Sequence, residues 1–211
     1  MKMMIIGAGG RLGIVLCREA CDRGHEVVGV SLGGENREPR LAEFWQSELF
    51  DLKKEDVLPY DVVICAYGSS FRTDPRSNRR AAEHLISICS KTDVRVLYVG
   101  NAGSLFTDET HETRVYETEE HPEFMRAISE QMTKGLEAFE KSKHLNWCYL
   151  CPSLDFDHEG LRTGAVQIGT DVLLYGRNGK SRISYADFAS VVLDEAESGA
   201  HTGEQITACV R

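Results

Sequence analysis

The sequence predicts an α/β fold in which strands and helices alternate around a parallel, doubly wound sheet. Three observations support this prediction. Short apolar runs of strand length, such as residues 3–6 and 61–66, are separated by longer segments with helical periodicity. A glycine-rich turn follows the first run directly, and the first helical segment comes next. Alternation of this kind indicates βαβ units, whose strands run parallel.

Each element follows from its own pattern of apolar and polar residues. Residues 12–20 carry an apolar stripe at helical spacing and precede Gly24, which suits a helix C-terminus. Pro122 suits the start of a helix that continues to Phe139. Further strands and helices are expected, in chain order, at residues 26–30, 49–50, 61–66, 75–90, 94–99, 147–150, 185–196 and 204–207. The less regular residues 152–180 are expected to form a small C-terminal lobe on the substrate side of a single domain spanning residues 1–211.

Composition and charge narrow the class of protein. The net charge is −9, from 24 basic and 33 acidic residues, which disfavours binding to nucleic acid or to an anionic membrane. No run approaches the ~20 apolar residues of a membrane span. Seven cysteines, an odd number in a chain of this length, disfavour a disulfide framework. Because no signal peptide is evident, we expect a cytoplasmic protein that binds a small molecule; the sequence does not indicate its oligomeric state.

The glycine-rich turn is the strongest functional signal in the sequence. Its spacing is Gly7, Gly10 and Gly13, so Leu12 stands where the generic GxGxxG pattern has its last glycine. Glycine at these positions permits a tight exit from the strand, backbone approach to a pyrophosphate and close helix packing. The pyrophosphate then lies at the positive end of the helix. We therefore expect a Rossmann-like fold whose cofactor is held by the turn residues Gly7, Gly9, Gly10, Arg11, Leu12 and Gly13.

The choice between NAD and NADP depends on the end of the second strand. NAD-binding proteins usually place an acidic residue there, whereas NADP-binding proteins use arginine nearby. Here Ser31 follows the strand, and no carboxylate occurs before Glu35. Ser31 could donate a hydrogen bond to a 2′-phosphate, and Arg11 or Arg37 could supply positive charge. The sequence therefore favours NADP over NAD.

Six segments together resemble a known family: IIGAGGRLG (5–13), FDL (50–52), DVVICAYG (61–68), LYVGNAGSL (97–105), WCYLCPS (147–153) and GKSRISYADFASVVLDEAE (179–197). The chain resembles the atypical short-chain dehydrogenase/reductase family over nearly its whole length. The resemblance is to the compact NAD(P)H-binding branch, which includes NADH-flavin reductases and is related to the NmrA-like and biliverdin reductase B types.

The resemblance implies roles for particular residues. Asp51 would contact the adenine, with Leu52 beside it. The segment beginning at Asn101 and Ala102 would approach the nicotinamide, and Pro152 and Ser153 would flank it from the other side. Three residues that follow the fourth strand would lie along the cofactor: Ala66, Tyr67 and Gly68.

One familiar catalytic pair is missing from the sequence. Ordinary short-chain dehydrogenases use Tyr-x-x-x-Lys, and none of the seven tyrosines here has lysine four residues later. Flavin reduction does not need that pair, because the cofactor carries the chemistry. We therefore expect an NAD(P)H-dependent oxidoreductase that reduces a flavin or a quinone-like acceptor by direct hydride transfer. The alternative is a non-catalytic, NAD(P)-sensing regulator of NmrA-like type.

Two other clusters contain residue types that functional sites use. The acidic residues 108–123 form either a solvated loop or a lid over the nicotinamide end; on the second interpretation Tyr116 is the candidate for stacking or proton donation. Cys148 and Cys151 have CxxC spacing, but they lie on a predicted strand, where residues three apart point to opposite faces. We expect these two cysteines to be buried structural residues, and we expect no metal site.

Overall fold

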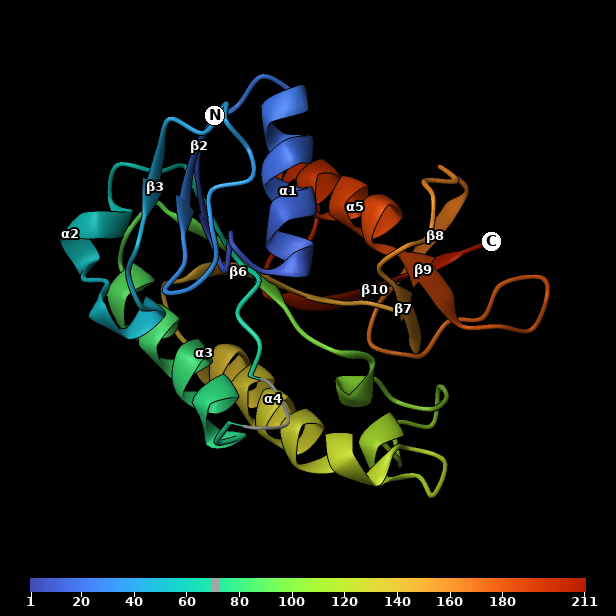
Figure 1. Ribbon diagram of the computed structural model, residues 1–211. Coiled ribbons are helices and arrows are strands. Elements are labelled where there is room, and N and C mark those ends of the chain that lie inside the picture. Colours follow the sequence, from blue (N-terminus) through green and yellow to red (C-terminus); the bar gives the residue numbers. More distant parts are fainter. Residues whose placement is uncertain (70–72) are drawn as a thin grey trace.

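The computed structural model describes residues 1–69 and 73–211, and within these residues eight strands form one sheet (Figure 1). The strand order is β3-β2-β1-β4-β5-β6-β10-β8. All neighbours pair in parallel except β8 and β10, which are antiparallel. The strands are β1 (Lys2–Ile6), β2 (Glu26–Val30), β3 (Glu43–Trp45), β4 (Val62–Cys65), β5 (Arg95–Val99), β6 (Asn146–Cys151), β8 (Val166–Gly169) and β10 (Glu204–Val210). This arrangement confirms the predicted Rossmann-like, doubly wound α/β fold.

Helices cover both faces of the sheet (Figure 1). One face carries α1 (Arg11–Asp22) and α5 (Tyr185–Ser198), and the other carries α3 (Arg76–Cys89) and α4 (Glu123–Lys141). The central strands β4 and β5 are buried along their whole length, as expected for a parallel sheet covered on both sides. The short elements are α2 (Lys54–Val57) and three 3₁₀ turns, η1 (Leu49–Asp51), η2 (Ala102–Ser104) and η3 (Val115–Glu117).

The third strand is not where the sequence analysis placed it. Residues 49–50 belong to the 3₁₀ turn η1, and the strand is β3, four residues earlier, at the edge of the sheet. Leu49 is buried in the core, which explains its apolar character without a strand. The edge strand β3 is only three residues long and begins with an exposed glutamate, so its apolar pattern is weak.

The C-terminal part of the chain adds a small second sheet. It pairs β7 (Asp155–Asp157) with β9 (Arg182–Ser184) in parallel. The loop before β8 is attached to α5 by the buried Asp187, whose carboxylate accepts hydrogen bonds from the backbone of Thr163 and Gly164. Arg162 in the same loop forms an ion pair with Glu19 of α1. The irregular lobe expected over residues 152–180 is therefore tied to the two helices on one face.

The cysteines behave as predicted. Cys148 and Cys151 are free thiols on β6, fully buried, and they belong to the cores on opposite faces of the sheet. Burial raises the pKa of the Cys151 thiol to about 12. No helix within residues 1–69 and 73–211 has the length and apolar character needed to cross a membrane.

Candidate functional site

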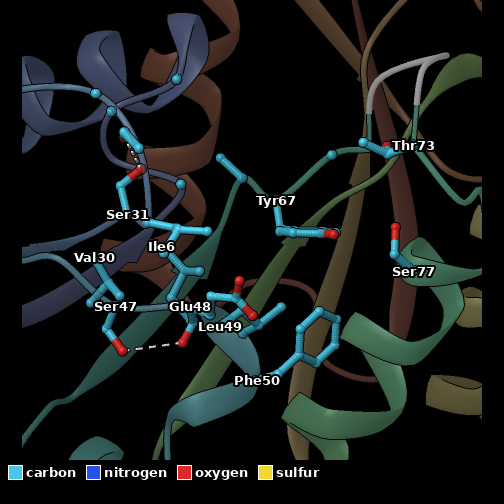
Figure 2. A pocket seen from close by; sticks show the side chains of 18 of the residues that line it. Ile6, Val30, Ser31, Ser47, Glu48, Leu49, Phe50, Tyr67, Thr73 and Ser77 are labelled. Atoms are coloured by element: carbon cyan, nitrogen blue, oxygen red, sulfur yellow. Dashed lines mark hydrogen bonds between the residues drawn. The ribbon is translucent and has the colours of Figure 1, made fainter.

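A cleft of about 810 Å³ opens at the carboxyl ends of β1, β2, β3 and β4, the strands formed by the first part of the chain. It lies beside β1, where the strand order reverses between β2 and β4, and this is the position at which open α/β sheets bind ligands. Figure 2 shows its walls, with Ser31 on one side, Ser77 on the other, and Tyr67 and Phe50 between them. The cleft is lined by the glycine turn and by the segments that follow β2, β3 and β4.

The conformation of the glycine turn requires glycine at Gly7 and Gly13. Gly7 has φ +85°, a left-handed conformation that glycine adopts without strain. A Cβ on Gly13 would lie 2.0 Å from the carbonyl oxygen of Gly7, so the first turn of α1 packs against the loop too closely for any side chain. The turn is also joined to the next strand, because the amides of Gly7 and Ala8 both donate to the Val30 carbonyl.

The amino-terminus of α1 fits a pyrophosphate. Gly10 precedes the helix and provides no side-chain cap, whereas Ser184 caps α5 by accepting from the Asp187 amide at 3.0 Å. The first backbone N–H groups of a helix need an acceptor, and the helix dipole favours an anion there. Gly10 lines the cleft and is exposed. A dinucleotide in the cleft would therefore place its pyrophosphate against the uncapped end of α1.

Across the cleft from Ser31, the wall is formed by two aromatic rings and an arginine. Phe50 packs edge-on against Tyr67, with ring centroids 5.9 Å apart, and the Arg80 guanidinium lies 5.8 Å from the Phe50 ring centroid. Asp74 lines the same side, and its hydrogen bonds with Arg76 lower the pKa of its carboxyl group. Flat rings beside polar groups suit an adenine base.

The structure brings together seven of the residues predicted from the sequence to bind the cofactor. These residues line the cleft: Gly7, Gly9, Gly10, Ser31, Ala66, Tyr67 and Gly68. Ser31 is not arranged as the sequence analysis expected, because its hydroxyl donates to the Gly33 carbonyl at 2.6 Å. That hydrogen is therefore not directed toward a 2′-phosphate.

The other predicted residues near the first half of the fold lie outside the cleft lining. Arg11 and Arg37 are exposed, and Leu12, in the first turn of α1, packs against the core. Asp51 is exposed at the end of η1, and Leu52 is buried beneath it. Of these residues, Arg11 lies near Tyr185, where it opposes the rise in the pKa of the phenol that burial causes.

The residues expected at the nicotinamide end lie along the same edge of the sheet, after β5 and β6, but also outside the cleft lining. Asn101 donates to the Ser129 hydroxyl of α4 at 2.9 Å, and Ala102 is buried. Pro152 and Ser153 are buried after β6, and the Ser153 hydroxyl donates to the Ala208 carbonyl at 2.8 Å.

Tyr116, the candidate catalytic residue, lies in η3, beside the segment that follows β5. The backbone amide of its neighbour Val115 donates to the Leu105 carbonyl, and Arg126 donates to the carbonyl oxygen of Tyr116. Partial burial and the nearby Glu117 raise the pKa of the Tyr116 phenol, so the group stays protonated at neutral pH. Tyr116 does not line the cleft.

The sequence analysis missed the wall that follows β3. Glu48, Leu49 and Phe50 line the cleft because they come directly after that strand. Residues after strand ends were the useful signal elsewhere in the chain. That signal does not identify these residues, because the sequence pattern predicts a strand at residues 49–50 themselves.

Comparisons with known proteins agree with this geometry. Residues 7–198 match the family model described as NAD(P)H-binding. The Bacillus subtilis protein YwnB, called uncharacterized, is 36% identical over 98% of this chain and 97% of its own length. A crystal structure from Streptococcus pneumoniae, called "a putative NADH-flavin reductase", is 32% identical, covers 100% of both chains and has a TM-score of 0.94. A "putative epimerase" from Bacteroides thetaiotaomicron is 28% identical over 99% of this chain and 96% of that one, with a TM-score of 0.85.

Proposed function

This chain belongs to the NAD(P)H-binding family, and on that premise we propose that it is an NAD(P)H-dependent reductase of a flavin or a quinone-like ring. The observation that carries the proposal is the cleft at the reversal of strand order, lined by a glycine turn that leads into an uncapped helix. The alternative, a protein that senses NAD(P) without catalysis, uses the same cleft and differs only in turnover.

The residues of the cleft account for cofactor binding. The amides at the start of α1 would hold the pyrophosphate, and Phe50 and Tyr67 would enclose the adenine. A bound nicotinamide cofactor supplies the hydride. The protein would contribute orientation and exclusion of water at the ends of β5 and β6, where Asn101 and Ser153 are held by their hydrogen bonds.

Two observations support a flavin or quinone as the acceptor. The sequence contains no Tyr-x-x-x-Lys pair, so the usual acid–base group for carbonyl reduction is absent. A relative that is 32% identical, with a TM-score of 0.94, is called a putative NADH-flavin reductase. Tyr116 remains the candidate proton donor of this proposal, because it lies beside the segment that follows β5 and its raised pKa keeps it protonated.

The preference for NADPH over NADH that the sequence indicates is part of what must be tested. It depends on Ser31, Arg11 and Arg37, of which only Ser31 lines the cleft. A cytoplasmic location is also proposed, because seven cysteines, an odd number in a chain of this length, disfavour a disulfide framework.

The test follows oxidation of NADH and NADPH by absorbance with FMN, riboflavin and a simple quinone as acceptors. We expect turnover above the rate without protein. We expect Tyr116→Phe to lower turnover without changing the dissociation constant of the cofactor, and Tyr175→Phe, at an exposed tyrosine of the C-terminal lobe, to change neither. If the cofactor binds and no acceptor is reduced, the reductase proposal fails and the sensing alternative stands.

A further inference from the structure

The ribose end of the cleft carries a carboxylate that the sequence analysis did not consider. We infer that Glu48 selects NADH over NADPH, because its charge lies where a 2′-phosphate would have to be placed. This inference deepens the proposed function and rests on its cofactor cleft. It opposes the preference for NADP that the sequence indicates.

The position of Glu48 follows from strand pairing. β2 and β3 are parallel neighbours with Val30 opposite Trp45, and the Ser31 amide donates to the Trp45 carbonyl at 3.0 Å. The chain therefore leaves both strands side by side at the edge of the sheet that binds ligands. In this fold the ribose 2′-hydroxyl is bound at the end of the second strand. Glu48, three residues after β3, lines the cleft there, as Ser31 does.

The backbone around Glu48 is held in place. Glu48 precedes η1, and its carbonyl oxygen accepts from the Asp51 amide at 3.2 Å. The next residue, Leu49, is only 4% exposed and anchors the turn in the core. In Figure 2 the Glu48 carboxylate projects into the opening below Tyr67. The carboxylate has no hydrogen-bond or ion-pair partner among residues 1–69 and 73–211, so no cation among those residues neutralises it.

The other charges of the described lining do not offset Glu48. They are Asp74 and Arg80, so the three charged residues sum to −1. Arg80 is 3.9 Å from the Asp74 carboxylate and lies over Phe50, on the α3 wall. A 2′-phosphate carries close to two negative charges at neutral pH, and like charges at close range repel. A 2′-hydroxyl, in contrast, can donate a hydrogen bond to a carboxylate.

The groups expected to hold a 2′-phosphate are placed elsewhere or already engaged. The Ser31 hydroxyl donates to the Gly33 carbonyl at 2.6 Å. Arg11 and Arg37 lie outside the cleft lining. Arg40, the next arginine along the same loop, is paired with Glu38 and Asp22. Among the described residues of the lining, Glu48 is therefore the charged group in the best position to distinguish the two cofactors.

The experiment measures binding alone, so that it does not depend on an acceptor. Dissociation constants for NADH and NADPH are measured by calorimetry with the intact protein and with Glu48→Gln. ADP and 2′,5′-ADP serve as probes of the adenosine half. Glu35→Gln is the matched control, because Glu35 is an exposed carboxylate in the loop after β2 that does not line the cleft.

We expect the unaltered protein to bind NADH at least about tenfold more tightly than NADPH, a difference of ~1.4 kcal/mol. Glu48→Gln should reduce that ratio by about tenfold, mainly by tightening NADPH and 2′,5′-ADP, and Glu48→Lys should reverse the preference. Glu35→Gln should leave the ratio unchanged. Tighter binding of NADPH by the unaltered protein, or a ratio that Glu48→Gln does not change, would overturn the inference. If the binding ratios change as expected but the protein reduces no flavin or quinone, the inference stands and the proposed function fails.

Discussion

Replacement of Gly10 by aspartate separates binding from folding at the glycine turn. Gly10 stands at the N-cap of α1 with φ −77° and ψ 165°, the extended conformation in which aspartate caps a helix well. A Cβ there would meet the Gly7 carbonyl oxygen at 3.1 Å, which a small shift relieves. We therefore expect Gly10→Asp to fold with a melting temperature equal to or above that of the unaltered protein.

The same substitution should abolish dinucleotide binding. The new carboxylate would bond to the helix amides and occupy the place of the pyrophosphate. Two unit charges about 4 Å apart repel by roughly 4 kcal/mol at the effective dielectric constant of a protein surface. Since 1.4 kcal/mol corresponds to about tenfold in affinity, the dissociation constant should rise by roughly a thousandfold.

The assay is titration of NADH into each variant, with circular dichroism to verify folding. Gly10→Ala is the matched control for the added Cβ and should weaken binding far less. Lys143→Gln makes the same change in net charge and should have no effect. Lys143 is exposed just before β6, at the amino ends of the strands and therefore away from the cleft. A folded Gly10→Asp protein that binds NADH as the unaltered protein does would refute the assignment of this turn to the pyrophosphate.

Three further predictions concern stability and pH. Gly13→Ala should destabilise the protein by about 1–3 kcal/mol in urea unfolding, because its Cβ would lie 2.0 Å from the Gly7 carbonyl oxygen and α1 would have to move. Glu195→Gln should lower stability by about 3 kcal/mol, because it leaves the guanidinium of Arg95, a residue only 6% exposed, without its buried counter-ion; thermal unfolding measures the loss. Partial burial lowers the pKa of His121, so the unfolded chain takes up that proton first as pH falls below about 6.5 and stability decreases there. His121→Gln should therefore lose less stability than the unaltered protein between about pH 7 and pH 5 in urea titrations, and equal losses would contradict the assignment.

The sequence predicted the fold well wherever burial produced a long or continuous apolar pattern. β5, buried along its length, and α4, with its apolar stripe, were both located within a residue or two. The short elements β3, β7 and β9 have three residues each, too few for a periodic signal. Their positions depend on pairing with strands far away in the sequence.

The error at the third strand had a consequence for the site. Ligand-binding residues follow strand ends, and the strand end at Trp45 points to Glu48, which a strand placed at residues 49–50 conceals. The sequence also could not reveal that the Ser31 hydroxyl is engaged by Gly33, since that bond depends on the shape of one loop.

Backbone hydrogen bonds between neighbouring strand ends hold the segments that line the cleft. The Gly7 amide donates to Val30, the Ser31 amide to Trp45, and the Ala66 amide to Ile6. These bonds join the ends of β1, β2, β3 and β4, the four strands that precede the cleft-lining segments. A site held in this way pays little conformational entropy when the ligand binds. Substitutions of side chains that project from this framework, such as Glu48, should therefore change which dinucleotide binds while leaving the framework in place, whereas Gly7 and Gly13 belong to the framework itself.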